Sequence, residues 1–271
     1  MSDPVDREAL RDLAVTVASR AAEDVRARAG APDLRIASKS SATDPVTEVD
    51  RAVEARLVAD LLAARPDDGV VGEEGADRAG SSGVRWIVDP IDGTVDFIYG
   101  IPGCNVTVAA EVDGRVAAAA VVDPLHGDTF AAVLGGGATR NGEPISCTTV
   151  ADPALALIGT GFGYDPAERA RQAAVVAHVL PRVRDIRRIG AASVDLCWVA
   201  CGRLDGYYER NLKIWDWAAG SLIASEAGAV VAAIGHRRLP EDLPAATIVA
   251  AGPALHPLLA DLVVAGGEPL D

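Results

Sequence analysis

Residues 84–94 read VRWIVDPIDGT, and the order of apolar and acidic residues in this stretch determines how we interpret the rest of the chain. The apolar run 84–88 predicts a buried β-strand, so Asp89 stands at the end of that strand. Asp92 follows three residues later, and Pro90 stiffens the backbone between the two carboxylates. Asp-Pro and Asp-Gly are also ordinary turn dipeptides. Their position directly after a strand favours a site for a cation or a phosphate group over a plain turn.

The residues around Asp92 supply further polar groups. Gly93 and Thr94 open a short helical turn, and their free backbone N–H groups suit a phosphate oxygen. The Ile91 carbonyl lies between the two carboxylates in sequence as another oxygen ligand. Hard cations take such ligands, and Mg²⁺ commonly binds one or two carboxylates together with waters and substrate phosphate. The stretch therefore predicts a magnesium or phosphate site at the end of a strand.

Three further segments place carboxylates beside glycine, threonine or tryptophan: Asp44–Asp50 (DPVTEVD), Gly72–Gly75 (GEEG) and Trp215–Gly220 (WDWAAG). Each segment also has a simpler interpretation. Glu73 and Glu74 could be a solvated charge pair on a loop. Asp50 could be an acidic residue in the first turn of a helix, where its charge interacts favourably with the helix dipole. Asp216 could be the N-cap of the following helix. The residues alone leave these alternatives open, and capping by Asp216 does not exclude metal binding.

The chain has 271 residues, enough for one large domain or two small ones, and 49% of them are hydrophobic while 24% are charged. This balance excludes a disordered, collagen-like or disulfide-scaffold protein. The formal net charge is -14, from 25 basic and 39 acidic residues. Such a chain repels nucleic acid and anionic membranes, so we expect neither as a partner. An anionic substrate would need a local reversal of charge, which a metal cluster held by carboxylates provides.

The four cysteines are Cys104, Cys147, Cys197 and Cys201, and none belongs to a C-x-x-C pair. Free thiols are therefore favoured over a metal site or a disulfide. The N-terminal residues lack the basic and apolar regions of a signal peptide, and the apolar runs are too short to span a bilayer. We therefore expect a cytoplasmic protein outside the membrane.

Hydrophobic periodicity predicts helices first, then an antiparallel meander, then alternating strands and helices. The expected helices cover residues 5–29, 47–64, 166–180, 192–201, 216–227 and 254–265. The expected strands cover residues 70–71, 84–88, 105–112, 115–123, 128–134, 155–160, 184–188, 204–209, 229–233 and 246–250, and residues 38–45 are expected to form a polar loop. We expect a layered α-β-α-β-α sandwich, with an antiparallel sheet in the N-terminal half and a mixed sheet in the C-terminal half. We expect a single domain over residues 1–271, with sub-halves of about 1–150 and 151–271.

The four acidic segments together resemble the inositol monophosphatase family of Mg²⁺-dependent, Li⁺-sensitive phosphatases. The chain matches the family patterns W-x-x-D-P-[IL]-D-G-T from Trp86, G-E-E from Gly72, D-x-V-T-x-x-D from Asp44 and W-D-x-A-A-G from Trp215. Their order and spacing fit across nearly the whole chain, from residue 39 to residue 228. One such motif would carry little weight, but four in register are specific.

The resemblance implies a role for each matching residue. The implied ligands of two to three Mg²⁺ ions are Glu73, Asp89, the Ile91 carbonyl, Asp92 and Asp216. The implied catalytic residues are Glu73, Thr94 and Asp50, of which Thr94 and Asp50 would together orient the attacking water. The implied phosphate- and substrate-binding residues are Asp92, Gly93, Thr94, Gly190, Ala191, Ala192, Glu209 and Asp216. Lys39 matches a family lysine in a mobile loop near the third metal and is a possible loop contact.

Two departures from the family pattern concern specificity. Asp96 stands where the family often has Asn, and Ala191 stands where it usually has Thr or Ser. Ala191 lacks the hydroxyl that could contact the substrate, so fine specificity does not follow from the resemblance.

These patterns favour a Mg²⁺-dependent hydrolase that releases phosphate from inositol monophosphate by metal-activated water, with no covalent nucleophile. The same chemistry on histidinol phosphate, fructose 1,6-bisphosphate or an adenosine 3′-phosphate nucleotide is the alternative, because only the walls near residues 160–215 would differ. A catalytically silent regulatory module on the same fold is the third hypothesis. The family also implies a homodimer that takes a small-molecule phosphate monoester.

Overall fold

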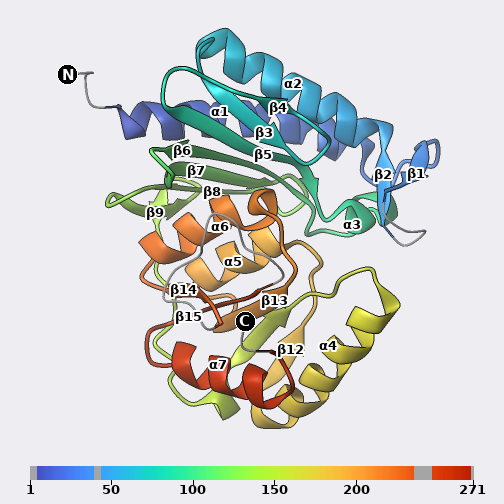
Figure 1. Ribbon diagram of the computed structural model, residues 1–271, viewed down its shortest axis with the longest axis vertical. Helices are drawn as coiled ribbons and strands as arrows, with labels where there is room; N and C mark the ends of the chain where they lie inside the picture. The colour runs from blue at the N-terminus through green and yellow to red at the C-terminus, as the bar shows by residue number, and fades with distance from the viewer. Residues whose placement is uncertain (1–4, 40–43, 235–245, 270–271) are drawn as a thin grey trace.

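Two β-sheets alternate with three layers of helices in the computed structural model, which describes residues 5–39, 44–234 and 246–269 (Figure 1). One outer layer contains α1 (Arg7–Arg28) and α2 (Glu48–Ala64), which cover one face of the larger sheet. The middle layer, between the sheets, contains α5 (Ala192–Ala200) and α6 (Ile214–Glu226). The other outer layer contains α4 (Pro166–Val179) and α7 (His256–Ala265), against the smaller sheet. The predicted α-β-α-β-α order is confirmed.

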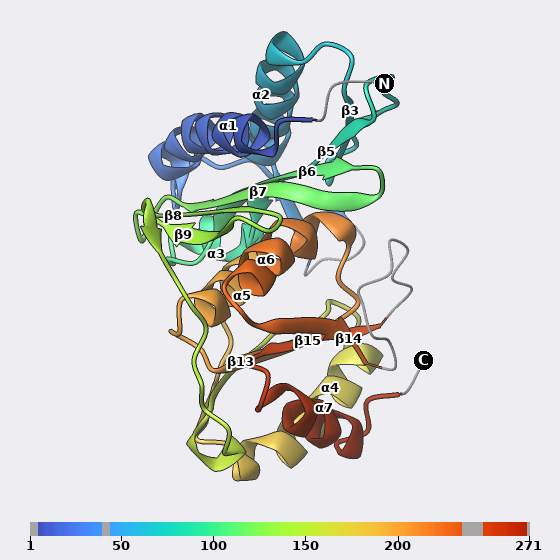
Figure 2. The same ribbon diagram turned by 90° about the vertical axis from the view of Figure 1, so that its left-hand side faces the viewer.

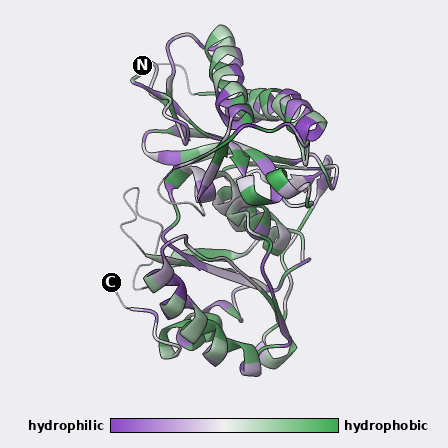
Figure 3. Cartoon of the chain, turned by 90° about the vertical axis from the view of Figure 1, so that its right-hand side faces the viewer, coloured by the Kyte–Doolittle hydropathy of each residue, from purple (hydrophilic) through white to green (hydrophobic). Residues whose placement is uncertain are grey.

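Local sequence explains where the first two helices begin. The Asp6 carboxylate caps α1 and accepts hydrogen bonds from the N–H groups of Glu8 and Ala9 at 3.0 and 3.1 Å. Thr47 caps α2, and Asp50 closes the reciprocal capping box. The buried face of α1 repeats at helical spacing through Leu10, Ala14, Val17, Ala18, Ala21, Ala22 and Val25. Figure 3 shows hydrophobic and hydrophilic residues mixed along these outer helices, as expected for helices with one buried face.

The larger sheet has eight strands in the described residues, in the order β10-β9-β8-β7-β6-β5-β3-β4. Their bounds are β3 Gly69–Gly72, β4 Asp77–Arg78, β5 Val84–Asp92, β6 Asn105–Val112, β7 Arg115–Asp123, β8 Asp128–Val133, β9 Gly137–Arg140 and β10 Glu143–Pro144. Neighbouring strands are antiparallel except for β3 and β5, which run parallel. The N-terminal sheet is therefore mainly antiparallel, and its one parallel pair brings the C-terminal ends of β3 and β5 to the same edge.

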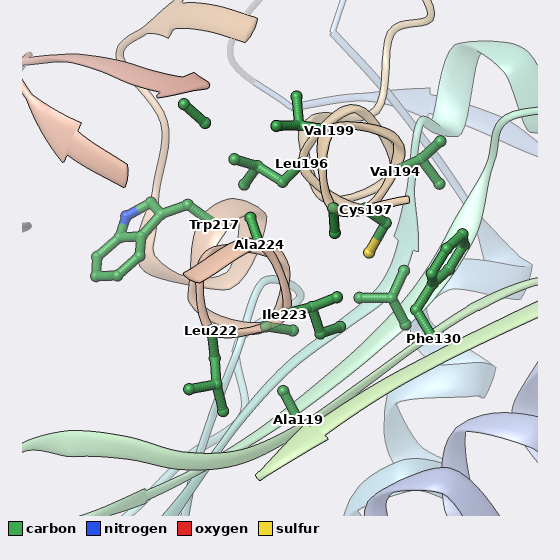
Figure 4. Close-up of a cluster of buried hydrophobic side chains, with 14 of the residues drawn as sticks. Ala119, Phe130, Val194, Leu196, Cys197, Val199, Trp217, Leu222, Ile223 and Ala224 are labelled. Atoms are coloured by element: carbon green, nitrogen blue, oxygen red, sulfur yellow. The ribbon is translucent and has the colours of Figure 1, made fainter. Parts of the chain in front are cut away.

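The middle helices are apolar on nearly all sides because both sheets cover them. Figure 4 shows Leu222 and Ile223 of α6 and Cys197 of α5 close to Ala119 of β7 and Phe130 of β8. These side chains belong to one buried cluster that joins the two halves of the chain. The four cysteines are free thiols, as the sequence predicts.

The smaller sheet is mixed, as predicted. Its described strands have the order β12-β11-β13-β15-β14. Their bounds are β11 Leu157–Thr160, β12 Asp185–Arg187, β13 Gly206–Arg210, β14 Val230–Ala233 and β15 Thr247–Ala251. Strand β11 is parallel to β12 and β13, whereas β15 is antiparallel to β13 and β14. In the described ranges of the chain, no helix combines the length and the apolar character that crossing a bilayer requires.

The elements that sequence periodicity misses are the short ones. At the two ends of the expected polar loop 38–45, β1 (Ile36–Ser38) and β2 (Pro45–Thr47) form an antiparallel ribbon, and residues 40–43 of that loop lie outside the described residues. Strands β4, β9 and β10 and the 3₁₀ turns Pro153–Leu155 and Leu180–Arg182 were not expected either. Segments of two to four residues carry too few positions to display a period.

Candidate active site

A cleft of about 740 Å³ lies where the ends of β3 and β5 meet the segments that precede α5 and α6. Most of the residues that the sequence analysis singled out line it: Lys39, Glu73, Asp89, Ile91, Asp92, Gly93, Thr94, Gly190, Ala192, Glu209 and Asp216. They come from both halves of the chain. The described lining contains eight carboxylates and four cationic side chains, so the cleft is acidic like the chain as a whole.

Strand β5 delivers the two central carboxylates, but it is longer than predicted. It extends to Asp92, and its pairing with β6 shifts register between Asp89 and Asp92. The Asp89 carboxylate is buried and accepts a hydrogen bond from the Ile91 N–H at 2.9 Å. The irregular pairing therefore lets both carboxylates of the Asp-Pro-Ile-Asp sequence face the same cleft.

Gly93 and Thr94 lie at the start of the short helix α3 (Thr94–Tyr99). Gly93 has φ +88°, and a Cβ there would lie 3.2 Å from the Cβ of Ala191 and 3.3 Å from the Cα of Cys104. Both the left-handed backbone and the close neighbours require glycine at this position. The Thr94 hydroxyl donates to Asp50 Oδ1 and to the Ile91 carbonyl, each at 3.1 Å. The predicted contact between Thr94 and Asp50 is therefore present.

Asp50 lies behind Thr94 rather than on the cleft surface. Its Oδ2 accepts hydrogen bonds from the hydroxyl and the N–H of Thr47 at 2.5 and 2.8 Å. Burial raises the pKa of Asp50, and these bonds from Thr47 oppose that rise. The helix cap thus holds the carboxylate that receives the Thr94 hydroxyl.

Glu73 and Glu74 follow the end of β3, and both pair with the side chain of Lys39. The Lys39 ammonium lies 2.8 Å from Glu73 Oε1 and also pairs with Glu74 Oε1. Burial lowers the pKa of Lys39, but the two carboxylates outweigh that effect and raise it overall. The interpretation of Glu73 and Glu74 as a solvated loop pair is wrong, because the Glu74 side chain is only 6% exposed.

Asp216 and Glu209 approach the cleft from the C-terminal half. Helix α6 begins at Ile214, so Asp216 is its third residue rather than its N-cap, and its Oδ2 accepts from the Lys213 N–H at 2.6 Å. Glu209 lies on β13 and accepts a hydrogen bond from the Tyr207 hydroxyl at 2.6 Å. Burial raises the pKa of Glu209 to about 7.

The Gly190–Ala192 segment is fixed by a carboxylate from the other half of the chain. Asp92 Oδ2 accepts from the Ser193 N–H at 2.9 Å and from the Ser193 hydroxyl, and the Ala192 N–H also donates to Asp92. Ala191 is the N-cap of α5 and offers no side-chain acceptor, so Asp92 takes that capping role. Ala191 itself is buried and does not line the cleft, which differs from its expected place among the substrate contacts.

The donor set suits a hard cation. Four of the eight carboxylates that line the cleft are the implied ligands Glu73, Asp89, Asp92 and Asp216, and Ile91, whose carbonyl is the fifth implied ligand, lines it with them. Burial and the neighbouring carboxylates, Glu73 first, raise the pKa of Asp89 well above its usual range, and burial and Asp92 do the same for Asp216. The site therefore holds more buried negative charge than its own side chains neutralise, which a divalent cation would relieve.

The implied ligands do not form a ready-made metal cage. Across residues 5–39, 44–234 and 246–269, no three His, Cys, Asp or Glu side chains form a group ready to hold a metal ion. Instead, Lys39 pairs with Glu73, Ser193 donates to Asp92, and the Lys213 N–H donates to Asp216. The expected close cage is therefore absent among the described residues.

Sequence reasoning missed several residues of the cleft and its supports. Tyr164, Arg188 and Lys213 line the cleft, and Asn105 and Ser193 hold the Asp92 carboxylate. The pair of basic residues Arg187 and Arg188, separated from Gly190 only by Ile189, could have indicated Arg188. Asp96, the departure from the family pattern, is buried, and burial raises its pKa to about 6 against the opposing charge of Arg188.

The layered fold and a cleft rich in oxygen donors beside a glycine-initiated helix define a class of protein, the α/β proteins that bind phosphate esters and hard cations. Comparison with known proteins is more specific. The model of the inositol monophosphatase family matches residues 6–268, and the chain belongs to this family. The activity of the family is that of a phosphatase, and its enzymes are generally metal-dependent.

Individual relatives agree with this assignment. The inositol-1-monophosphatase SuhB of Mycobacterium tuberculosis (strain ATCC 25618 / H37Rv) is 48% identical over 241 residues, which cover 82% of this chain and 83% of that protein. The Nus factor SuhB of Escherichia coli (strain K12) is 35% identical over 226 residues, which cover 81% and 83%. The crystal structure of the extragenic suppressor protein suhB from Bartonella henselae superposes with a TM-score of 0.88 at 32% identity, covering 94% of this chain and 98% of that one.

Proposed function

We propose that the protein is a Mg²⁺-dependent phosphate monoesterase that releases phosphate from inositol monophosphate. One observation carries this proposal: the four implied carboxylate ligands line one cleft together with Gly93 and Thr94. The name of the Mycobacterium tuberculosis relative, an inositol-1-monophosphatase, supports the substrate.

The proposed ligands of two to three Mg²⁺ ions are Glu73, Asp89, the Ile91 carbonyl, Asp92 and Asp216. When bound, such ions supply an activated water and neutralise charge on the phosphoryl oxygens and the leaving alkoxide. The surplus of buried carboxylates supports this role. Lys39 now supplies positive charge to Glu73 at 2.8 Å, and a bound cation would supply positive charge to the same carboxylate.

The chain's own residues orient the water and the phosphate. Asp50 accepts a hydrogen bond from the Thr94 hydroxyl, so a lone pair of Thr94 Oγ1 is free to accept a hydrogen bond from the attacking water. The N–H groups of Gly93 and Thr94 would donate to phosphate oxygens. Glu73 is assigned with them to the catalytic set because it would hold the water-activating cation.

The C-terminal wall would select the alcohol part of the substrate. Glu209 can accept hydrogen bonds from ring hydroxyls, and Asp216, Gly190 and Ala192 line the same side of the cleft. Glu209 could equally face a substrate ammonium, so histidinol phosphate, fructose 1,6-bisphosphate and an adenosine 3′-phosphate nucleotide remain the alternative substrates for the same chemistry.

The decisive experiment measures phosphate release from these four substrates with and without Mg²⁺, for the unaltered protein and for Asp89→Asn. We expect preference for inositol monophosphate, no release without a divalent cation, and a loss of at least about 1000-fold in kcat for the variant. Far-ultraviolet circular dichroism checks that the variant keeps its fold. Full activity of a folded Asp89→Asn protein would refute the site.

Further properties follow the family resemblance and are proposals of the same kind. We propose a cytoplasmic homodimer without nucleic-acid partners, in which residues 1–271 act as one catalytic domain. The capping of α5 by Asp92 supports a single unit, because it ties the two halves together at the cleft. The net charge of -14 opposes nucleic-acid binding. Light scattering in solution measures the oligomeric state.

The name of the Escherichia coli relative, Nus factor SuhB, favours a regulatory role as the second candidate function. Such a role would depend on association with another protein rather than on turnover. A stoichiometric protein partner that binds the unaltered chain and Asp89→Asn equally well, together with no turnover of the four substrates, would favour this candidate.

A further inference from the structure

Glu54 is a buried acid of α2 that the proposed mechanism does not use. Its side chain points to the turn after β3, where Oε2 accepts from the Glu74 N–H at 2.8 Å and Oε1 accepts from the Ala76 N–H at 2.9 Å. The residue is only 5% exposed. A buried carboxylate normally requires a cation or several donors, and here two backbone donors of one turn fill that role.

The chain leaves space for this carboxylate at Gly72. A Cβ at Gly72 would overlap with Oε2 of Glu54 and would lie 3.0 Å from Cγ2 of Val88. The φ angle of Gly72 is not left-handed, so the backbone conformation does not require glycine at this position. The absence of a side chain instead leaves space for the Glu54 carboxylate. The glycine of the Gly-Glu-Glu motif and the acid on α2 are therefore complementary.

The clamped turn carries the two acids that face Lys39. The Gly72 N–H donates to the Ala76 carbonyl at 2.8 Å, which closes the turn, and Glu54 binds it from the opposite side. Glu73 lies between the closing residue Gly72 and the clamped residue Glu74. With Glu54 removed, the Glu74 and Ala76 N–H groups would lose their acceptor, and the backbone that orients Glu73 would be free to move.

We propose that Glu54 is a positioning residue, which clamps the 72–76 turn through two backbone N–H groups and thereby aims the Glu73 carboxylate at the cation site. This inference rests on the proposed function, because it assigns Glu73 to a cation. Glu54 does not line the cleft, so it would act on the orientation of Glu73 and not on the substrate.

The test compares Mg²⁺ binding by calorimetry in the unaltered protein, Glu54→Gln and Glu54→Ala. An amide can accept one of the two N–H groups but presents its own N–H to the other, so Glu54→Gln loses part of the clamp and Glu54→Ala loses all of it. Residues that orient metal ligands typically contribute 10- to 100-fold to affinity. We expect the Kd for Mg²⁺ to rise about 10-fold in Glu54→Gln and towards 100-fold in Glu54→Ala, with faster amide hydrogen exchange over residues 73–76.

Asp68→Asn is the matched control for general destabilisation. Asp68 is also a buried acid, at the opposite end of β3, where it accepts from Trp86 Nε1 at 2.8 Å and from the Ser82 hydroxyl at 2.6 Å. Asp68→Asn should lower the melting temperature and leave the Kd for Mg²⁺ unchanged. An equal change of Kd in Asp68→Asn and Glu54→Gln would reduce Glu54 to a structural residue and overturn the proposal.

Gly72→Ala supplies a second route that does not alter Glu54 chemically. The added methyl group would displace the Glu54 carboxylate, so Gly72→Ala should weaken Mg²⁺ binding, and adding it to Glu54→Ala should change the Kd little further. Additive effects of the two substitutions would contradict the clamp. If the unaltered protein takes up no Mg²⁺, the proposed function itself fails. If it binds Mg²⁺ and the Glu54 variants bind it equally well, only the role of Glu54 fails.

Discussion

The buried acids behind the two walls of the cleft are held in different ways. Behind the N-terminal wall, Asp50 and Glu54 each accept at least two hydrogen bonds from backbone N–H groups or threonine hydroxyls. Behind the C-terminal wall, Asp195 is fully buried in the first turn of α5, and neither of its oxygens has a hydrogen-bond partner among the described residues. Glu209, beside it, accepts from the Tyr207 hydroxyl.

This difference changes how strongly burial acts on each carboxyl group. Burial raises the pKa of Asp50 and of Glu54, but the donors that each acid accepts oppose that rise. Burial and the charge of Glu209 raise the pKa of Asp195 well above its usual range, and no hydrogen-bond donor in the described part of the chain opposes them. The N-terminal acids are thus held in place by donors, whereas burial without donors favours the protonated form of Asp195.

Among the substitutions that test this contrast between the walls, removing the Thr94 hydroxyl should give the largest effect, and that effect should be confined to the N-terminal wall. Thr94→Val keeps the shape of the side chain but leaves Asp50 Oδ1 without its donor and the attacking water without its acceptor. We expect kcat to fall by about 100- to 1000-fold with KM changed less than about threefold. Steady-state kinetics on inositol monophosphate measures both constants, and a change in KM alone would mean that Thr94 only binds substrate.

Glu209→Gln tests the C-terminal wall through binding instead of chemistry. Because the pKa of Glu209 is raised to about 7, the unaltered side chain is ionised above that pH and protonated below it. We therefore expect KM to increase as the pH falls through 7. In Glu209→Gln we expect KM to be about 10-fold higher at pH 8, since a hydrogen bond to a charged group contributes about 1.5 kcal/mol or more.

The pH dependence is the sharper part of that test. The difference in KM between the two proteins should shrink below pH 6, where Glu209 is itself neutral. A constant ratio of KM values from pH 5.5 to pH 8.5 would show that ionisation of Glu209 does not control substrate binding.

The sequence predicts one wall of the cleft much better than the other. Local features of the Asp-Pro-Ile-Asp-Gly-Thr stretch predict the positions of Asp89 and Asp92. These features are the strand before Asp89, the stiff backbone at Pro90 and the left-handed turn that favours glycine at position 93. Helix capping likewise gives the position of Asp50. These features depend on neighbours within a few residues, so a single chain segment contains the information.

Local sequence patterns do not predict contacts between residues that are far apart in the chain. Asp92 caps α5 about a hundred residues away, and Glu54 reaches a turn that follows it by about twenty residues. Nothing in the periodicity of α2 distinguishes Glu54 from an exposed helical acid, and the parallel pairing of β3 with β5 has no local signal. The close metal cage was likewise expected from the motifs alone, which specify ligand identity but not rotamers.

Asp195→Asn should have the smallest effect on activity and the clearest effect on stability. An asparagine has the shape of a protonated aspartic acid and cannot ionise, so the substitution preserves the state that burial favours at neutral pH. We expect kcat and KM to change less than about twofold. In the unfolded chain the pKa of Asp195 is near its ordinary value of 3.8, whereas the folded protein retains the proton to a higher pH.

The sign of the pH effect follows from this difference. An acid whose pKa is raised on folding stabilises the folded state fully at low pH, and that contribution is lost as the pH rises from about 4 towards the folded pKa. Between pH 5 and pH 8 the free energy of unfolding of the unaltered protein should therefore fall relative to that of Asp195→Asn, by at most about 1.4 kcal/mol per pH unit. Urea denaturation at several pH values measures it. Parallel stability curves for the two proteins would mean that Asp195 is ionised in the folded state, and the contrast between the two walls would then be wrong.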